Sequence, residues 1–304
     1  MSGFMTVGIV QTALEIGLIY SLIALSLFIS YSILNICDLS TDGCYTLGSA
    51  VGAVVTIAGH PLLAIPAAML AGACSGFVTA LLQTYFGVES ILAGIIVNTG
   101  LYTINLAVMD FSANVSIFGT DTVFSLFKNL SQNETWQSWS KLIFLAAVVI
   151  LICLLIYWFL GTRLGLSIRA TGDSPAMVRA SSINPAFTII VGLCLSNSLT
   201  GLAGCLIAQY NKSTNISIGI GMVTIALASL VIGETISGKR RMPVRIACVV
   251  LGSCLYRFII SIALRLNVPT EAFKLVSAII VAVALIAPNA KDKFSLFMRK
   301  RASR

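Results

Sequence analysis

Long apolar runs recur along this chain and constrain its fold more than any other feature. Runs of about 20 apolar residues can cross a bilayer as helices, which satisfy their own backbone groups there. The sequence therefore predicts an all-α polytopic membrane protein with about eight to ten transmembrane helices, built as one domain over residues 1–304. The candidate spans are residues 8–30, 43–58, 61–86, 90–109, 139–160, 186–209, 221–237, 244–265 and 273–288.

Charged residues are too few to cover a soluble protein of this size. They make up 10% of the 304 residues, against about 25% in an ordinary soluble domain. The formal net charge of +8 is concentrated beside apolar runs, in residues 239–245 and in a basic tail, 289–304. Basic residues placed in this way indicate cytoplasmic segments, so we expect no nucleic-acid partner. The eight cysteines follow no zinc or disulfide spacing, and we expect neither a metal site nor a cofactor.

The same charge pattern predicts which loops face the cytoplasm. Residues 161–185 carry three arginines and one aspartate, and with residues 238–245 and the C-terminal tail they are predicted to be cytoplasmic. Residues 110–138 carry mainly acidic charge and are predicted to lie outside. The side of the N-terminus stays open.

Polar residues inside the spans are candidates for a solute path. The segment "NICDLSTDGC", residues 35–44, is polar but short, and it predicts a broken helix with Gly43 and Gly48 as its irregular points. Asparagine also bonds adjacent membrane helices together, so each candidate has a structural alternative. The candidate path residues are Asp38, Thr41, Asp42, Asn98, Asn105 and Asn197.

Three further charged residues lie in or beside apolar runs. We expect Glu15 and Arg257 to pair with one another or with backbone groups, and Glu234 to pair with a neighbouring arginine. Glu234 also lies in "GETISGKRRMP", residues 233–243, which resembles the start of a nucleotide-binding P-loop. Arg240 stands where that motif needs Ser or Thr, and the flanking runs are membrane spans, so we interpret the segment as a cytoplasmic turn.

Residues 165–185, "GLSIRATGDSPAMVRASSINP", predict a short cytoplasmic helix between two spans. Ser174 is a capping residue followed by Pro175 at the first helical position, and Asn184-Pro185 opens the next span in the same way. The short helix is expected to expose Met177, Val178 and Ala180, which suits either a partner's groove or a plain connection.

This segment resembles the cytoplasmic-loop signature of ABC importer permeases of the branched-chain amino acid/ribose type. The matching residues are Arg169-Ala170, Gly172-Asp173-Ser174 and residues 176–180, with Ser174 and Ser182 standing where that family usually has Asn and Gly. The blocks "NICDLSTDGCYTLGSAVGAV" and "ESILAGIIVNTGLYTINLAVM" are similar to a subgroup described as tryptophan/tyrosine permeases. The likeness covers nearly the whole chain.

The resemblance implies a subunit that moves a small solute, an amino acid and in this subgroup an aromatic one, into the cell. It implies two permease copies in the bacterial inner membrane, an ABC ATPase on each cytoplasmic short helix and an extracytoplasmic substrate-binding lipoprotein, with lipid around the spans. The chain itself would not be an enzyme. The ATPase-coupling residues it implies are Arg169, Gly172, Asp173, Ser174, Met177, Val178 and Arg179.

The alternative is a stand-alone secondary transporter coupled to an ion. Such a protein needs intramembrane carboxylates for coupling, and Glu15 and Glu234 are the candidates. A membrane-embedded enzyme is disfavoured because no metalloprotease, serine-hydrolase or paired-carboxylate pattern is present.

Overall fold

The computed structural model describes residues 7–129, 134–238 and 240–265, and it is helical over most of them. The first helix, α1 (Val7–Leu27), continues without a break into a π-helix, η1 (Phe28–Ile33). The other long helices are α2 (Thr41–Ile57), α3 (Pro61–Thr84), α4 (Ser90–Val108), α6 (Glu134–Gly161), α9 (Pro185–Asn211), α10 (Met222–Ser237) and α11 (Met242–Arg265). The shorter elements are β1 (Asn114–Ser116), α5 (Val123–Lys128), α7 (Arg163–Asp173), α8 (Pro175–Ala180) and β2 (Ser213–Asn215).

The predicted all-α polytopic fold is confirmed. Within the described ranges, six helices are long and apolar enough to cross a membrane: α1 with η1, α3, α4, α6, α9 and α11. The predicted spans at 43–58 and 221–237 correspond to α2 and α10, which have 17 and 16 residues and are shorter. The predicted span 273–288 and the tail 289–304 lie outside the described residues.

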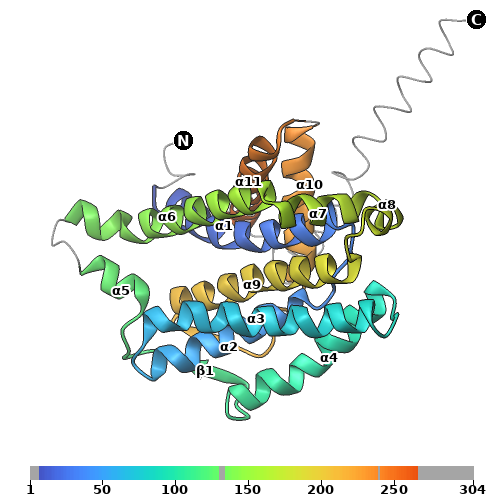
Figure 1. The fold of residues 1–304 in the computed structure, drawn as a ribbon. Coiled ribbons are helices and arrows are strands. Elements are labelled where there is room, and N and C mark those ends of the chain that lie inside the picture. Colours follow the sequence, from blue (N-terminus) through green and yellow to red (C-terminus); the bar gives the residue numbers. More distant parts are fainter. Residues whose placement is uncertain (1–6, 130–133, 239, 266–304) are drawn as a thin grey trace, which may run out of the picture.

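Helix α9 forms the centre of the bundle and packs against α1, α2 and α3. Most of the apolar length of α1 and α9 is buried, whereas most of that of α4 and α6 is exposed. Figure 1 shows α6 and α4 on opposite sides of the bundle, with α9 and α3 between them. The buried helices are therefore those that can carry polar side chains away from lipid.

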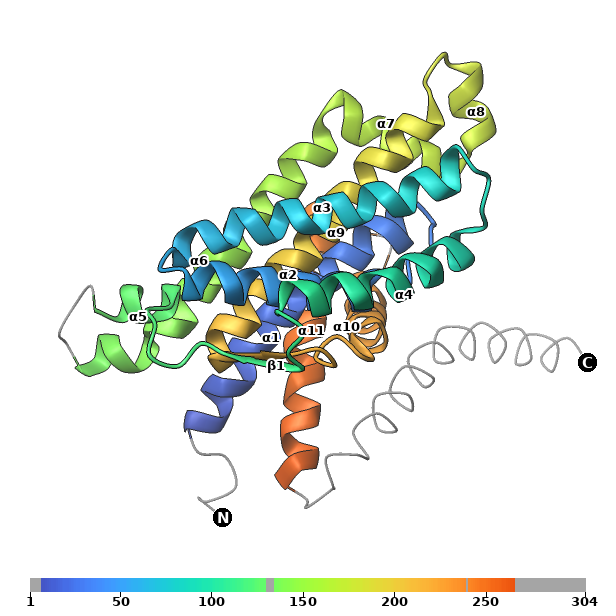
Figure 2. The same cartoon turned by 90° about the horizontal axis from the view of Figure 1, so that it is seen from below.

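The two ends of the bundle carry different connections. At one end lie α5 and the two-stranded antiparallel sheet that joins β1 to β2. At the other end lie α7 and α8, as Figure 2 shows. The segments expected outside and in the cytoplasm are thus at opposite ends, which agrees with the alternation that the basic residues predict.

The break in the N-terminal segment is present, but its position corrects our prediction. Residues 34–40 are irregular, whereas Gly43 and Gly48 lie inside α2. Both glycines are instead places of close packing. A Cβ at Gly48 would stand 2.2 Å from the carbonyl oxygen of Gly201, so the backbones of α2 and α9 are in direct contact.

Candidate functional site

The short helix of the connection that we expect in the cytoplasm begins and ends as the sequence predicts. The Ser174 Oγ accepts a hydrogen bond from the Met177 N–H at 3.4 Å, and Pro175 occupies the first turn of α8. The Asn184 Oδ1 accepts from the Ala186 N–H at 2.9 Å, which caps α9. Side-chain oxygens at these positions satisfy N–H groups that a helix start leaves without partners. Both caps fix α8 between α7 and α9.

The exposed face of α8 includes fewer of the expected residues than the sequence predicts. The side chain of Met177 is 70% exposed, and Arg179 and Ala180 are exposed too. Val178 is only 3% exposed, so the expectation that it faces the cytosol was wrong. The helix packs on α7 and α9, and a helix held at both ends must turn one side toward them. Val178 occupies that side.

The second residue after α8 adopts a backbone conformation that favours glycine. Ser182 has φ +60°, in the left-handed region. Its N–H donates to the Arg179 carbonyl oxygen at 3.1 Å, and the Ile183 N–H donates to that of Val178 at 3.2 Å. This is a helix ending of the left-handed type, and it explains why glycine would be suitable at this position.

Gly172 brings α7 into backbone contact with η1. A Cβ at this position would stand 1.8 Å from the carbonyl oxygen of Ile33 and 3.1 Å from the Cα of Leu34. No side chain fits there without a shift of one backbone. The connection that leads into α8 therefore touches the residues that lead into the irregular segment, 34–40.

Arg169 does not share the exposed face of α8. It lies on α7, is half-buried, and lines a cavity of about 310 Å³ between the end of α6, α7 and the start of α11. Asp173, the last residue of α7, is exposed instead. The expected coupling residues thus divide between the surface of α7–α8 and this cavity.

The irregular segment is held by a buried polar cluster. The Asp38 side chain is 1% exposed; its Oδ1 accepts from the Ser40 N–H and its Oδ2 from the Asn197 Nδ2, both at 2.8 Å. The Thr41 hydroxyl donates to the Asp38 carbonyl oxygen at 3.0 Å, and that of Thr79 donates to Ser40 Oγ at 3.3 Å. These bonds join the segment to α9 and α3. Three of the candidate path residues are therefore in one cluster.

Asp42 has a different role in the fold. Its carboxylate oxygens accept from the N–H groups of Gly221 and Val223 at 3.0 and 2.8 Å. These groups belong to the start of α10, whose own N-cap residue, Gly221, provides no side-chain acceptor. An acidic side chain suits the positive end of a helix dipole. Asp42 thus caps α10 from the neighbouring helix α2.

The two remaining asparagines of the predicted path lie on α4. The Asn105 Nδ2 donates to the Gly43 carbonyl oxygen at 3.0 Å, so Asn105 links α4 to α2. Asn98 is half-buried and faces Gly43, where an added Cβ would stand 2.6 Å from its Oδ1. All six candidates therefore surround the start of α2.

Several buried oxygen atoms near this place have no hydrogen-bond partner among the described residues. They are Asn197 Oδ1, Asn105 Oδ1 and Ser75 Oγ. An unsatisfied buried acceptor is costly and rare in folded proteins. The polar cluster at the start of α2 therefore retains capacity for additional hydrogen bonds.

Glu15 and Arg257, which lie within the spans α1 and α11, do not pair as expected. Glu15 accepts from the Tyr210 hydroxyl at 2.8 Å and from the Gln11 Nε2 at 2.9 Å. The Arg257 guanidinium lies over the Tyr20 ring, 4.4 Å from its centroid. The expected pairing of Glu15 with Arg257 or with backbone was wrong: Glu15 bonds Gln11 of its own helix and Tyr210 of α9, and Arg257 stacks on Tyr20 of α1.

The expected ion pair of Glu234 is confirmed. Its carboxylate lies 2.8 Å from Nη2 of Arg245, and both groups also bond the hydroxyl of Ser32 in η1. Glu234 lies near the end of α10, and the next helix begins at Met242. The segment that resembles a P-loop thus includes the end of α10 and the start of α11, and a helix rather than the strand that a P-loop needs precedes it.

Comparisons with known proteins identify the family of the chain. Residues 9–285 match the family described as the branched-chain amino acid transport system permease component. The chain belongs to this family. A tyrosine transport system permease protein of Clostridioides difficile (strain R20291) is 33% identical over 274 residues, which cover 90% of this permease and 89% of that relative.

Two other relatives extend the comparison. An uncharacterized protein of Rickettsia prowazekii (strain Madrid E) is 30% identical over 289 residues, covering 93% of the permease and 99% of the relative. A ribose import permease protein of Escherichia coli (strain K12) is 28% identical over 267 residues, covering 84% and 78%. No solved structure matches the permease with significance.

These findings establish the general function. The chain is the permease component of an ABC-type transport system and a multi-pass protein of the bacterial cell membrane. Its family is one of transport components rather than of enzymes. The similar proteins are named for an amino acid and for a sugar.

Sequence analysis missed some residues that the structure brings to these places. Ser32 joins η1 to the pair of Glu234 and Arg245, and Ser40 and Thr79 complete the polar cluster. Serine and threonine give no signal in an apolar run, because their hydroxyls often bond the helix's own backbone. The position of Arg245, eleven residues after Glu234 across a short turn, was the one available hint.

Proposed function

We propose that this permease is the membrane-spanning subunit of an importer that takes up an amino acid, with tyrosine or another aromatic amino acid as the first candidate. Two copies form the pathway, a separate ABC ATPase docks on the α7–α8 connection of each, and a substrate-binding lipoprotein delivers the solute from outside. The name of the Clostridioides difficile relative and the coverage of nearly the full length of both chains support the amino-acid assignment.

The observation that carries the coupling part is the contact between Gly172 and Ile33. Met177, Arg179 and Asp173 face away from the bundle and form the surface that an ATPase can contact. Gly172 connects that surface to η1 by direct backbone contact. A displacement of α8 would therefore move the segment that carries Asp38.

Ser174 and Val178 act by positioning in this scheme. Ser174 caps α8, and Val178 anchors it against the bundle. Neither presents enough surface for a partner, whereas the side chain of Met177 does. A side chain such as Met177 adapts readily to a groove in another protein.

The start of α2 is where we place the solute path. Asp38, Thr41 and Asn197 bond one another here, and Asn98 and Asn105 face the same helix from α4. In this conformation these side chains bond one another rather than a solute. The unpartnered oxygens of Asn197 and Asn105 would accept bonds from a solute or from water once residues 34–40 move.

The experiment is reconstitution into vesicles of the permease with the ATPase that copurifies with it and with the candidate binding protein. We expect ATP-dependent uptake of radiolabelled tyrosine that unlabelled phenylalanine or tryptophan reduces and ribose does not. Uptake of ribose but not of tyrosine would contradict the amino-acid assignment and leave the importer assignment intact. Uptake driven by an ion gradient without ATP would contradict both.

A stand-alone ion-coupled transporter gains no support from the geometry. Glu15 is bonded to Tyr210 and Gln11, and Glu234 to Arg245 and Ser32. A coupling carboxylate must be able to exchange its ion, and in this conformation both carboxylates are engaged with side chains of neighbouring helices.

A further inference from the structure

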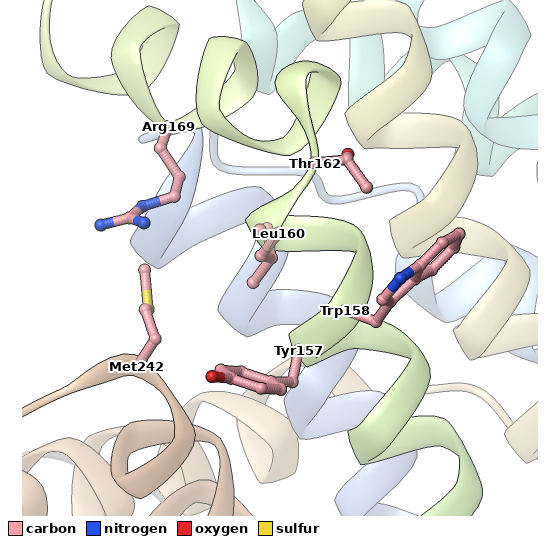
Figure 3. A pocket seen from close by; sticks show the side chains of 7 residues that line it. Tyr157, Trp158, Leu160, Thr162, Arg169 and Met242 are labelled. Carbon is pink, nitrogen blue, oxygen red and sulfur yellow. The ribbon is translucent and has the colours of Figure 1, made fainter.

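The cavity beside Arg169 lies at the cytoplasmic end of the bundle, where the membrane-spanning part of α6 ends. Its volume is about 310 Å³. Figure 3 shows the side chains of Arg169 and Met242 approaching from α7 and α11, with Tyr157 of α6 below them. Within the part of the chain that the structure describes, no hydrogen bond or ion pair occupies the Arg169 guanidinium. The labelled residues of its lining are Tyr157, Trp158, Leu160, Thr162, Arg169 and Met242.

An apolar groove of about 620 Å³ adjoins this cavity at Tyr157. It runs between α6 and α11 with α1 at its floor, and its lining includes Ile150 and Leu154 on one side and Ala247 and Leu251 on the other. Tyr157 lines both spaces, and Met242 of the cavity is followed directly by Pro243 of the groove. The two spaces thus form one continuous site with a cationic end and a long apolar part.

We propose that this site binds one anionic phospholipid of the inner leaflet, with its phosphate on Arg169 and an acyl chain in the α6–α11 groove. A guanidinium suits phosphate because it offers several donors in a plane. Basic pockets between membrane helices on the cytoplasmic side bind anionic headgroups on this principle. Arg241, exposed and directly before Met242 of the lining, adds positive potential at the entrance.

The aromatic residues place the site at the depth of lipid headgroups. Tyr157 and Trp158 are 52% and 69% exposed at the cytoplasmic end of α6. Tyrosine and tryptophan concentrate at membrane–water interfaces, where one end of the ring system is apolar and the other is hydrated. A soluble anion would gain nothing from the groove, whereas a phospholipid fills both parts at once.

The headgroup part of the proposal is tested with the full-length purified permease in detergent. An equimolar mixture of phosphatidylglycerol and phosphatidylcholine with the same acyl chains is added, and retained lipid is counted by native mass spectrometry. We expect wild type to prefer phosphatidylglycerol and Arg169→Gln to lose about fivefold of that preference. Arg163→Gln, on the same helix but outside the cavity, should keep the wild-type ratio.

Three results of this measurement would overturn the proposal. Equal losses of the phosphatidylglycerol preference in Arg169→Gln and Arg163→Gln would mean that the general surface charge attracts the lipid and that no specific site binds it. Displacement of phosphatidylglycerol by millimolar inorganic phosphate would mean that the cavity binds the free anion. An unchanged lipid ratio in Arg169→Gln, together with loss of the copurifying ATPase, would assign this arginine to the partner protein.

The acyl-chain part is tested by filling the groove. Ala247 is exposed, so Ala247→Trp adds bulk without entering the core, and it should lower the retention of both lipids. Leu255→Trp, on the same helix and outside the groove lining, is the matched control. Unchanged retention in Ala247→Trp would overturn the proposal. So would a disulfide between Cys153 and a cysteine introduced singly at residues 279–283, since the groove would then hold the chain's own apolar segment.

Discussion

Gly172→Ala is the most direct test of how movement would reach the proposed solute path. The added Cβ would stand 1.8 Å from the Ile33 carbonyl oxygen, and real contacts of this kind are not shorter than 3.0 Å. Either α7 moves outward or η1 moves inward until that separation is reached. Overpacking of this size costs about 1–3 kcal/mol.

We expect this free-energy cost to reduce the coupling of ATP hydrolysis to uptake more than it reduces the stability of the fold. Gly172 is half-buried on a short helix at the end of the bundle, so α7 can shift without opening the core. If α8 and η1 must move together, a bias of 1–3 kcal/mol between conformations corresponds to about 5- to 150-fold in their equilibrium. We expect tyrosine uptake per ATP hydrolysed to fall at least about fivefold, while the ATPase still binds.

The assay compares ATP hydrolysis and uptake in the same vesicles. Gly100→Ala is the matched control, because a Cβ on Gly100 has nothing within 4 Å. That variant should behave as wild type. If Gly172→Ala keeps wild-type uptake per ATP, or if hydrolysis and uptake fall in the same proportion, the contact with Ile33 does not transmit the movement of α8.

The remaining predictions concern separate contacts. Met177→Glu should weaken copurification of the ATPase at least about fivefold without lowering the unfolding temperature, because Met177 is 70% exposed; unchanged copurification would remove α8 from the proposed docking surface. Asp42→Ala should destabilise the permease by about 1–2 kcal/mol in thermal unfolding, since two N–H groups of α10 lose their acceptor. Arg245→Gln should cost about 1 kcal/mol, given that the pair with Glu234 is partly exposed, and high salt should reduce the difference from wild type.

The helices were predictable because apolar length is a property of single segments. Eight of the expected spans have a helix at their position, and the caps at Ser174 and Asn184 are local signals that need no tertiary information. The position of the break was not predictable in the same way. Glycine marks irregular backbone and close packing alike, and only the approach of Gly201 identifies Gly48 as a packing residue.

The sequence predicted which residues belong to the candidate site, but not which partners their side chains bond. A polar side chain in an apolar run must find partners, and the sequence therefore identified Asp38, Asp42 and Asn197. Which partner each one finds depends on how the helices are arranged. Glu15 bonds Tyr210, a residue 195 positions away in sequence, and Arg257 stacks on Tyr20. No periodicity encodes such pairs.

The irregular segment and the π-helix before it are best understood together. A continuous helix from α1 through α2 would satisfy its backbone internally and could move only as a rigid body. Here the chain leaves the helix after Ile33, where Gly172 touches it, and re-enters a helix at Thr41, where Asp38 and Asn197 bond. Residues 34–40 are thus the one stretch within the described part of the bundle that connects the contact at Gly172 to the buried polar cluster without regular backbone bonding. Because side chains rather than a hydrogen-bonded helix hold this stretch, it can change conformation at a lower cost than its neighbours, which is the property that a coupled gate requires.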